Sequence, residues 1–224
     1  MPILVSLTQF FIRTLARVLM LFLSKVEVKG KDNAEKTSRP LLIIANHKSY
    51  YDPLVIAVSL SVFSKVYPLR FIAKDQLFKG FLSRITFYLM GSFPTYYGNG
   101  LDKSLEIPVA ILREKGTVVF FPEGKCIREE ALGEGRMGAA TLALKVPEAQ
   151  ILPMAISGSY KIGRIFNRPK VKTRIGEPFY LKDRINITGS TTAEEVTDLF
   201  MREIGKLYEP LAEKKLEKSR VYQT

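Results

Sequence analysis

The sequence predicts an α/β domain in which a mixed, largely parallel sheet is flanked by helices. Short apolar runs at 41–45, 117–121 and 151–156 have the length and composition of strands that are buried on both faces. Segments with helical patterns lie between these runs, and such alternation is typical of α/β domains. Ligands of these sheets bind beyond the carboxyl ends of the strands. We therefore expect a functional site in the loops that follow the three runs.

The 224-residue chain carries a formal net charge of +12, and its length suits one large domain or a domain with a short appendage. The charge indicates an anionic partner: nucleic acid, an acidic membrane surface or a phosphorylated substrate. We find no helix-turn-helix, zinc-finger or RRM pattern, so nucleic acid is not expected. The only cysteine, Cys126, suits a reducing compartment. With one cysteine and one histidine, a structural zinc site is excluded.

Residues 3–23 form an apolar run that polar side chains interrupt at helical spacing. These side chains fall on one narrow stripe: Ser6, Gln9, Arg13, Arg17 and then Ser24. A secretory signal is disfavoured because no basic region precedes the run. A simple membrane span is disfavoured because each central arginine costs about 2.5–3.5 kcal/mol on the insertion scale. A helix packed on the protein's own core is the remaining alternative. Because the apolar face is wider than one core contact requires, we predict an amphipathic membrane-interface helix over residues 1–24 and one domain over residues 25–224.

The other elements are assigned from periodicity and turn residues. Further strands are predicted at 26–28, 67–73, 92–97 and 170–175. Further helices are predicted at 54–62, 81–90, 102–115 and 137–146, and from a capping box at Thr192 and Glu195 onwards. Asp102 is expected to cap its helix, and Pro108 is expected to kink or shorten it. Residues 31–39 and 98–100 are expected to be loops.

His47 is the only histidine and follows the strand predicted at 41–45. Asp52 and Pro53 form a strong helix-start pattern, so His47 and Asp52 lie on a strand-to-helix turn. If imidazole chemistry occurs at neutral pH, His47 has to supply it. The alternative is that Asp52 only caps the helix and His47 is an ordinary turn residue. A pocket that His47 faces is favoured because three loops follow predicted strands: Asn46 to Asp52, Pro122 to Arg128, and Ser157 to Ser159.

Three blocks of residues resemble the motifs of the PlsC-type glycerolipid acyltransferases. In the order of the family's motifs they are Asn46-His47 followed by four residues and Asp52, then Phe121 to Gly124, then Leu152 to Gly158. The resemblance covers nearly the whole chain after Lys25 and implies the fold of that family. It also implies transfer of an acyl chain to lysophosphatidic acid, which gives phosphatidic acid. In this chemistry His47 takes the proton of the acceptor hydroxyl and Asp52 orients the imidazole.

The resemblance also implies the acyl donor, whereas the location is expected from the wide apolar face of residues 3–23 and the high positive charge. The acceptor hydroxyl attacks a thioester of acyl-CoA or acyl-carrier protein directly, so no acyl-enzyme, metal or other cofactor is expected. Glu123 and Gly124 are implied to line the acceptor side, and backbone N–H groups near the turns are candidate oxyanion donors. We expect the protein at the cytoplasmic face of the cell membrane, in contact with membrane lipids and an anionic surface.

This sequence departs from the family pattern where phosphate is held. The third motif usually continues with Thr-Arg-Ser, but this chain has Lys125-Cys126-Ile127 and then Arg128. The second motif usually ends in arginine, whereas the matching stretch, 91–97, ends in Tyr-Tyr. We predict that Lys125 and Arg128 bind the phosphate, with Lys74 as a third candidate, although lysine lacks the bidentate fork of arginine. The acceptor can therefore also be another lysophospholipid.

Two other classes of function stay open. The first is a thioester or lipid hydrolase with Cys126 as nucleophile and His47 as base, which requires the two side chains to lie within hydrogen-bond reach. The second is a catalytically inactive lipid-binding homologue, against which the intact His47 and Asp52 argue. A basic stretch is either a solvated face or a contact for anionic headgroups or acyl-carrier protein. Its members are Lys161, Arg164, Arg168, Lys170, Lys172 and Arg174.

Overall fold

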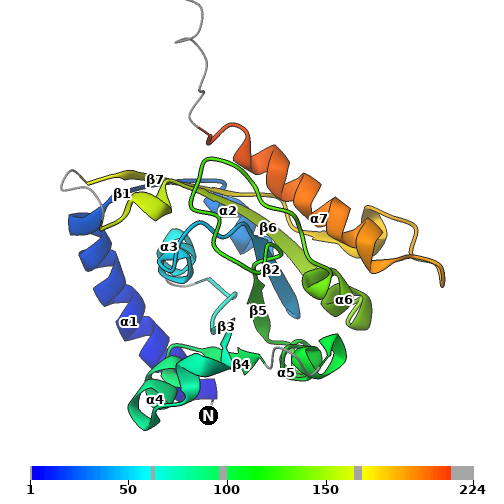
Figure 1. Ribbon diagram of the computed structural model, residues 1–224, viewed down its shortest axis with the longest axis horizontal. Helices are drawn as coiled ribbons and strands as arrows, with labels where there is room; N and C mark the ends of the chain where they lie inside the picture. The colour runs from blue at the N-terminus through cyan, green and yellow to red at the C-terminus, as the bar shows by residue number, and fades with distance from the viewer. Residues whose placement is uncertain (1, 62–63, 96–99, 164–167, 213–224) are drawn as a thin grey trace, which may run out of the picture.

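The computed structural model of the protein describes residues 2–61, 64–95, 100–163 and 168–212. Within these residues, one mixed sheet has the strand order β1-β7-β6-β2-β5-β3-β4, and β8 pairs with β6 (Figure 1). The strands are β1 (Lys25–Lys29), β2 (Leu41–Ala45), β3 (Leu69–Lys74), β4 (Ser92–Thr95), β5 (Thr117–Phe120), β6 (Gln150–Ser157), β7 (Lys170–Ile175) and β8 (Phe179–Tyr180). Strands β2 to β6 are parallel to one another, whereas β7 and β8 are antiparallel to β6, and β1 is parallel to β7. The predicted α/β class with a mixed, largely parallel sheet is confirmed.

Strand β2 lies in the middle of the sheet and is buried on both faces, as its apolar run predicts. Its alternate side chains enter two separate cores. Leu42 and Ile44 belong to the core that α5 (Leu101–Arg113), α6 (Gly138–Lys145) and α7 (Ala193–Tyr208) cover. Leu41 and Ile43 belong to the core that α1 (Pro2–Leu23), α2 (Lys31–Glu35) and α3 (Asp52–Ser59) cover. Figure 1 shows α1 and α3 on the side of the sheet opposite α6 and α7.

Two local predictions are wrong. Residues 31–35 form the helix α2 instead of part of a loop, and the Asn33 side chain donates to the carbonyl of Ile175 (3.0 Å), which anchors this helix to β7. Asp102 does not cap α5, because the helix begins at Leu101 with Gly100 as the N-cap. Asp102 instead pairs with Lys145 of α6 at 2.9 Å. Helix α5 includes Pro108 and ends at Arg113, two residues before the predicted end.

Most other elements agree with their predicted positions within a few residues. Helix α4 (Phe81–Leu89) follows a 3₁₀ turn at Asp75–Phe78, and α4 contacts both α1 and β4. Helix α7 begins with the predicted capping box, in which Thr192 and Glu195 exchange side-chain and backbone hydrogen bonds. The predicted strand at 92–97 is β4, of which 96 and 97 lie outside the described residues. Gly98, Asn99, Arg164 and the chain after 212 lie outside them too.

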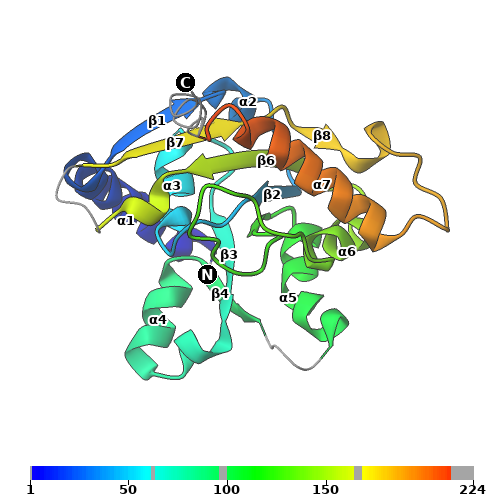
Figure 2. The same cartoon turned by 45° about the horizontal axis from the view of Figure 1, so that its top comes forward.

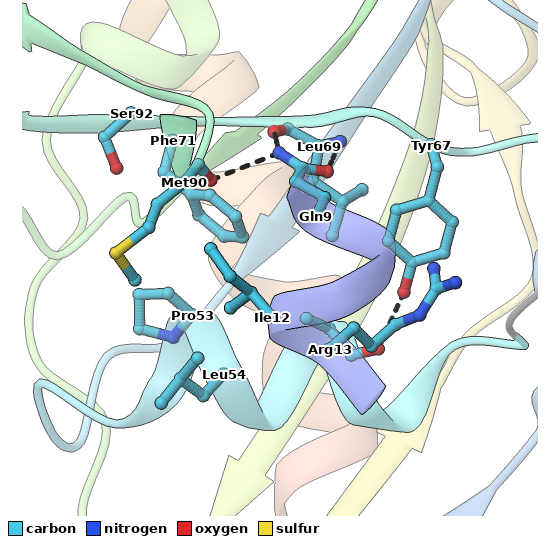
Figure 3. A pocket seen from close by; sticks show the side chains of 11 residues that line it. Gln9, Ile12, Arg13, Pro53, Leu54, Tyr67, Leu69, Phe71, Met90 and Ser92 are labelled. Atoms are coloured by element: carbon cyan, nitrogen blue, oxygen red, sulfur yellow. Dashed lines mark hydrogen bonds between the residues drawn. The ribbon is translucent and has the colours of Figure 1, made fainter. Parts of the chain in front are cut away.

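Gln9, Arg13 and Arg17 of the polar stripe of α1 face the body of the protein. Gln9 is buried and makes three hydrogen bonds with the backbone of β3 and of the end of α4: its Nε2 donates to Leu69 O (2.5 Å) and Met90 O (3.1 Å), and its Oε1 accepts from Leu69 N (2.9 Å) (Figure 3). Arg13 is 4% exposed and stacks on the ring of Tyr67, with 4.0 Å from Cζ to the ring centroid. Arg17 Nη2 donates to Leu60 O at 2.8 Å. These residues hold α1 against α3, β3 and the end of α4.

The apolar face of α1 therefore points away from the protein. Exposed large side chains on this face are Leu7, Phe10, Phe11, Leu15, Val18, Leu19 and Phe22. Phe11, Leu15 and Phe22 are 69%, 70% and 73% exposed. Such contiguous apolar exposure marks a contact with a membrane or with another protein. Among the described helices, none combines the length and the apolar character that crossing a membrane requires.

Candidate active site

The turn after β2 is fixed to the neighbouring strand β6 by one side chain. Asn46 is fully buried, its Nδ2 donates to Ile156 O (2.8 Å), and its Oδ1 accepts from Ile156 N (2.7 Å). The amide of Asn46 thus continues the hydrogen-bonding pattern of the sheet beyond the end of β2. Because both amide groups are used, the backbone that leads into His47 has a defined direction.

Asp52 lies at the first position of α3 and directs its carboxylate back towards the turn. The N-cap of α3 is Tyr51, so Asp52 does not cap the helix in the manner that the alternative interpretation required. Asp52 is fully buried, and its Oδ2 accepts from His47 Nδ1 (2.8 Å), Lys48 N (2.6 Å) and Ser49 N (2.7 Å). Its Oδ1 accepts from the hydroxyl of Ser159 at 2.5 Å. The carboxylate fixes the ring of His47 through Nδ1, so Nε2 faces away from Asp52.

His47 is held between Asp52, Cys126 and an aromatic ring. Cys126 Sγ lies 3.1 Å from Nε2, and the ring of Phe121 stacks on the imidazole with 4.2 Å between centroids. Burial by itself lowers the pKa of His47, but the hydrogen bonds and negative charge of Asp52 and Cys126 outweigh burial and raise this pKa to about 9. The hydrolase alternative requires Cys126 and His47 to lie within hydrogen-bond reach, and the structure places them at that distance.

Glu123 joins the two loops that carry His47 and Cys126. It is 1% exposed, its Oε2 accepts from His47 N (2.5 Å), and its Oε1 accepts from Gly133 N (2.6 Å). Burial raises the pKa of Glu123 above its ordinary value, and these two N–H donors offset only part of that rise. Ile127 N donates to His47 O at 2.7 Å, which adds a second link between the same loops. The observed contacts of Glu123 are therefore with backbone, and its predicted contact with the acceptor stays a prediction.

Lys48 anchors the long segment between β5 and α6 through its side chain, a role that the sequence analysis did not predict. Lys48 is fully buried, and its Nζ donates to Glu129 O (2.9 Å) and to Ala131 O. Burial lowers the pKa of Lys48 below its ordinary value, and nearby carboxylates, with Glu123 first among them, offset only part of that fall. Figure 2 shows this green segment crossing in front of β2 and β6 on its way to α6. The segment thus folds over the strand ends and brings Cys126 to His47.

The three predicted phosphate ligands have exposed side chains. Lys125 and Arg128 are exposed, and the guanidinium of Arg128 lies over the ring of Tyr50 at 5.5 Å. Lys74 is exposed at the end of β3, where it pairs in register with Thr95 of β4. In the predicted basic stretch, Lys161 pairs with Glu130 at 3.7 Å and Lys170 with Glu27 at 3.6 Å. Contacts of all these side chains with a ligand stay predictions.

A largely apolar cavity of about 470 Å³ opens beside the histidine. The ends of β3 and β4, the start of α5 and the segment after β5 form its walls. The lining residues are Ile72, Thr95, Gly100, Leu101, Ser104, Leu105, Phe120, Phe121, Pro122, Gly124, Arg136 and Gly138. Phe121 both lines the cavity and stacks on His47, so the cavity and the imidazole share a wall. Gly124, a predicted substrate-binding residue, is placed here, whereas Arg136 was not foreseen from the sequence.

A buried carboxylate, an oriented imidazole and an adjoining apolar cavity define a site for acid–base chemistry on a substrate with an apolar part. Within the described residues, no group of three or more His, Cys, Asp or Glu side chains is arranged to hold a metal ion. The family model described as Acyltransferase matches residues 25–157. The chain therefore belongs to this acyltransferase family.

Relatives agree with this assignment, and a solved structure shares the fold. The chain is similar to the 1-acyl-sn-glycerol-3-phosphate acyltransferase of Bacillus subtilis, with 25% identity over 196 residues, covering 85% of this chain and 92% of that protein. It is also similar to the probable 1-acyl-sn-glycerol-3-phosphate acyltransferase of Mycoplasma pneumoniae, with 31% identity over 168 residues, covering 65% of this chain and 61% of that protein. The crystal structure of the 1-acyl-sn-glycerophosphate (LPA) acyltransferase PlsC from Thermotoga maritima matches with a TM-score of 0.71 and 21% identity, covering 91% of this chain and 79% of that one. This last match shows a shared fold.

Proposed function

We propose that the protein transfers an acyl chain from a thioester to the free hydroxyl of lysophosphatidic acid, which gives phosphatidic acid. The observation that carries this proposal is the contact of buried Asp52 with His47 Nδ1, next to an apolar cavity whose wall includes the Phe121 ring stacked on the imidazole. Family membership and the names of the relatives support the same reaction.

In the proposed reaction, His47 moves one proton between the two substrates. The acceptor hydroxyl takes the place of the Cys126 thiol at Nε2 and gives up its proton as its oxygen attacks the thioester carbonyl. The tetrahedral intermediate then expels the thiolate of acyl-CoA or acyl-carrier protein, and the imidazolium returns the proton to that sulfur. Asp52 stabilises the imidazolium that forms between these steps. No metal or cofactor is needed, because the thiolate is already a good leaving group.

The direct test is the identity of the products. Purified protein is incubated with acyl-CoA or acyl-carrier protein and a panel of lysolipids, of which some carry a phosphate monoester and others do not. The products are identified by mass spectrometry. We expect phosphatidic acid from lysophosphatidic acid as the main product. A preference for another lysolipid would replace the acceptor in this proposal but leave acyl transfer intact. Free fatty acid as the main product would contradict acyl transfer.

The 3.1 Å contact of Cys126 Sγ with His47 Nε2 favours one second candidate, a thioester hydrolase. In that reaction the Cys126 thiolate displaces the donor thiol and forms an acyl-cysteine, which water then hydrolyses. Intact-mass measurement after incubation with donor alone distinguishes the two functions. A trapped acyl-enzyme that is lost in Cys126→Ala supports the hydrolase, whereas full turnover of Cys126→Ala supports direct transfer.

We propose that the outer face of α1 lies in the interface of the membrane that holds the lipid substrates, at the cytoplasmic side. Because the polar stripe of α1 is bonded to the protein, the face that remains presents large apolar side chains. The adjoining α4 extends this surface with Phe81 and Leu82, which are 73% and 75% exposed, and Arg84 beside them is exposed as well. Apolar burial would supply most of the binding, and basic side chains near α4 would add a part that salt weakens.

Vesicle sedimentation of a variant with Phe11, Leu15 and Phe22 each changed to Gln tests this surface. Full burial of one such side chain contributes roughly 1.5–3 kcal/mol, so we expect binding to fall by more than about tenfold. Thr14→Gln is the matched control, because Thr14 is exposed on the same helix and its replacement removes no large apolar side chain. Sedimentation of the triple variant equal to that of Thr14→Gln would show that the protein attaches elsewhere.

A further inference from the structure

We propose that Arg136 binds a phosphate group at the mouth of the apolar cavity beside His47, an inference that rests on the acyl transfer proposed above. Among the described residues that line this cavity, Arg136 is the only charged one. A guanidinium in otherwise uncharged walls offers a directed, bidentate contact for a phosphate. The ligand class is therefore a phosphate ester with an apolar chain or arm.

The segment between β5 and α6, whose Cys126 contacts His47, also carries Arg136. Arg136 N donates to Pro122 O at 2.8 Å, which closes the segment between β5 and α6 into a loop. The side chain then lies across Gly124: a Cβ at Gly124 would come within 2.9 Å of Arg136 Cδ and 3.2 Å of Nε. Gly124 has φ +64°, so the backbone conformation and the arginine contact both favour glycine here. Two residues further on, Cys126 contacts His47 Nε2, so the segment that carries the proposed anchor also contacts the proposed base.

The charge of Arg136 is available to a ligand. The side chain is exposed, and within the described part of the chain it forms no ion pair with a carboxylate. The nearby carboxylate of Glu123 accepts backbone N–H groups at both oxygens instead. By contrast, the predicted ligand Arg128 lies over Tyr50 and does not line the cavity. Arg136 thus supplies the guanidinium that the third motif of this chain lacks at Cys126.

The phosphate can come from either substrate, and kinetics separates the two sources. KM and kcat are measured for lysophosphatidic acid and for the thioester donor in Arg136→Gln, Arg136→Lys and the control Arg113→Gln. Arg113 is an exposed arginine at the far end of α5, away from the cavity. We expect Arg136→Gln to raise the KM for lysophosphatidic acid roughly 10- to 100-fold, as for loss of a charged hydrogen bond. Arg136→Lys restores part of the loss, because lysine keeps the charge without the fork.

A rise confined to the KM for lysophosphatidic acid assigns the phosphate to the acceptor. A rise confined to the donor's KM supports the same phosphate site and assigns it to the phosphopantetheine arm. Calorimetric titration of wild-type and Arg136→Gln protein with a short-chain lysophosphatidic acid, without donor, needs no turnover. A wild-type protein that binds this lipid through Arg136 but does not acylate it would contradict the proposed function and leave the phosphate site standing. Unchanged KM values and unchanged titrations relative to Arg113→Gln would overturn the role of Arg136.

Discussion

Two regions of the protein depart from the usual pattern of apolar side chains inside and polar side chains outside. The strand ends around His47 bury polar groups, and the outer face of α1 exposes apolar ones. Around His47, polar and charged groups are buried, and Asp52 and Lys48 have no exposed surface. On α1, phenylalanines and leucines are exposed while Gln9 and Arg13 are buried. Helix α7 shows the ordinary arrangement, because it buries Val196, Phe200 and Ile204 and presents polar residues to solvent.

The difference between the two regions lies in where their partners are. The carboxylate of Asp52 accepts four hydrogen bonds from this chain, so the cost of burying it is met inside the protein. The exposed side chains of α1 find too few apolar neighbours in the protein to leave water. Changes near His47 should therefore affect chemistry or folding, whereas changes on the outer face of α1 should affect neither.

The largest expected effect is on the chemical step. His47→Ala removes the proposed base, and general-base assistance contributes typically about 10²–10⁴-fold, so kcat should fall by that factor. Turnover measured at saturating substrate, with circular dichroism to check the fold, tests this. Near-normal turnover in His47→Ala would break the comparison, because the buried polar cluster would then have no catalytic role.

The next effect is on stability as well as activity. Asp52→Asn places an NH₂ group where the carboxylate accepts hydrogen bonds, so at least one buried donor loses its partner, at a cost of about 1–3 kcal/mol. Denaturant unfolding measures this cost. Asp102→Asn is the matched control, because Asp102 is 87% exposed and its pair with Lys145 is worth about 0–1 kcal/mol. Equal unfolding free energies for the two variants would contradict the structural role of Asp52.

Substitutions on the inner and outer faces of α1 should have different effects on the unfolding free energy. Gln9→Ala should lower the unfolding free energy by about 1–3 kcal/mol, because it removes the partner of Leu69 N and of two carbonyls. Leu15→Gln, on the outer face, should change it by less than about 0.5 kcal/mol in the absence of lipid. Thermal unfolding of both variants in lipid-free buffer is the measurement. A larger loss for Leu15→Gln would mean that the outer face packs within the protein.

The smallest expected effect is a displacement of the pH profile. With a pKa of about 9, His47 is mostly protonated at neutral pH, so kcat/KM should rise as pH increases towards that value. Cys126→Ala removes a group that raises the pKa of His47, so the rise should move to lower pH and activity near neutral pH should increase. Profiles of wild-type and Cys126→Ala protein with one donor and one acceptor test this. An unmoved profile would show that Cys126 does not control the protonation of His47.

Much of the turn that carries His47 and Asp52 was predictable because its determinants are local. The apolar run 41–45 specifies a strand buried on both faces, and Asp52-Pro53 specifies a helix start. The geometry of one short turn then brings His47 and Asp52 together. Cys126 and Ser159 lie 79 and 107 residues from their partners in this site, so no local pattern could place them at these distances. The contact of Arg136 with Gly124 likewise depends on how a long segment folds over the strand ends.

The sequence alone determined the α/β class, the order of the strands and helices along the chain, the turn that carries His47 and Asp52, and the amphipathic character of residues 3–23. Periodicity and turn residues are sufficient for these features because they act over a few neighbouring residues. The tertiary structure decided which face of α1 points outwards, which cation lies at the cavity and which side chain meets Nε2 of His47. Those outcomes depend on partners far away in the chain: Gln9 turns inwards because the backbone of Leu69 and Met90 offers it hydrogen bonds, and that choice leaves the apolar face outside.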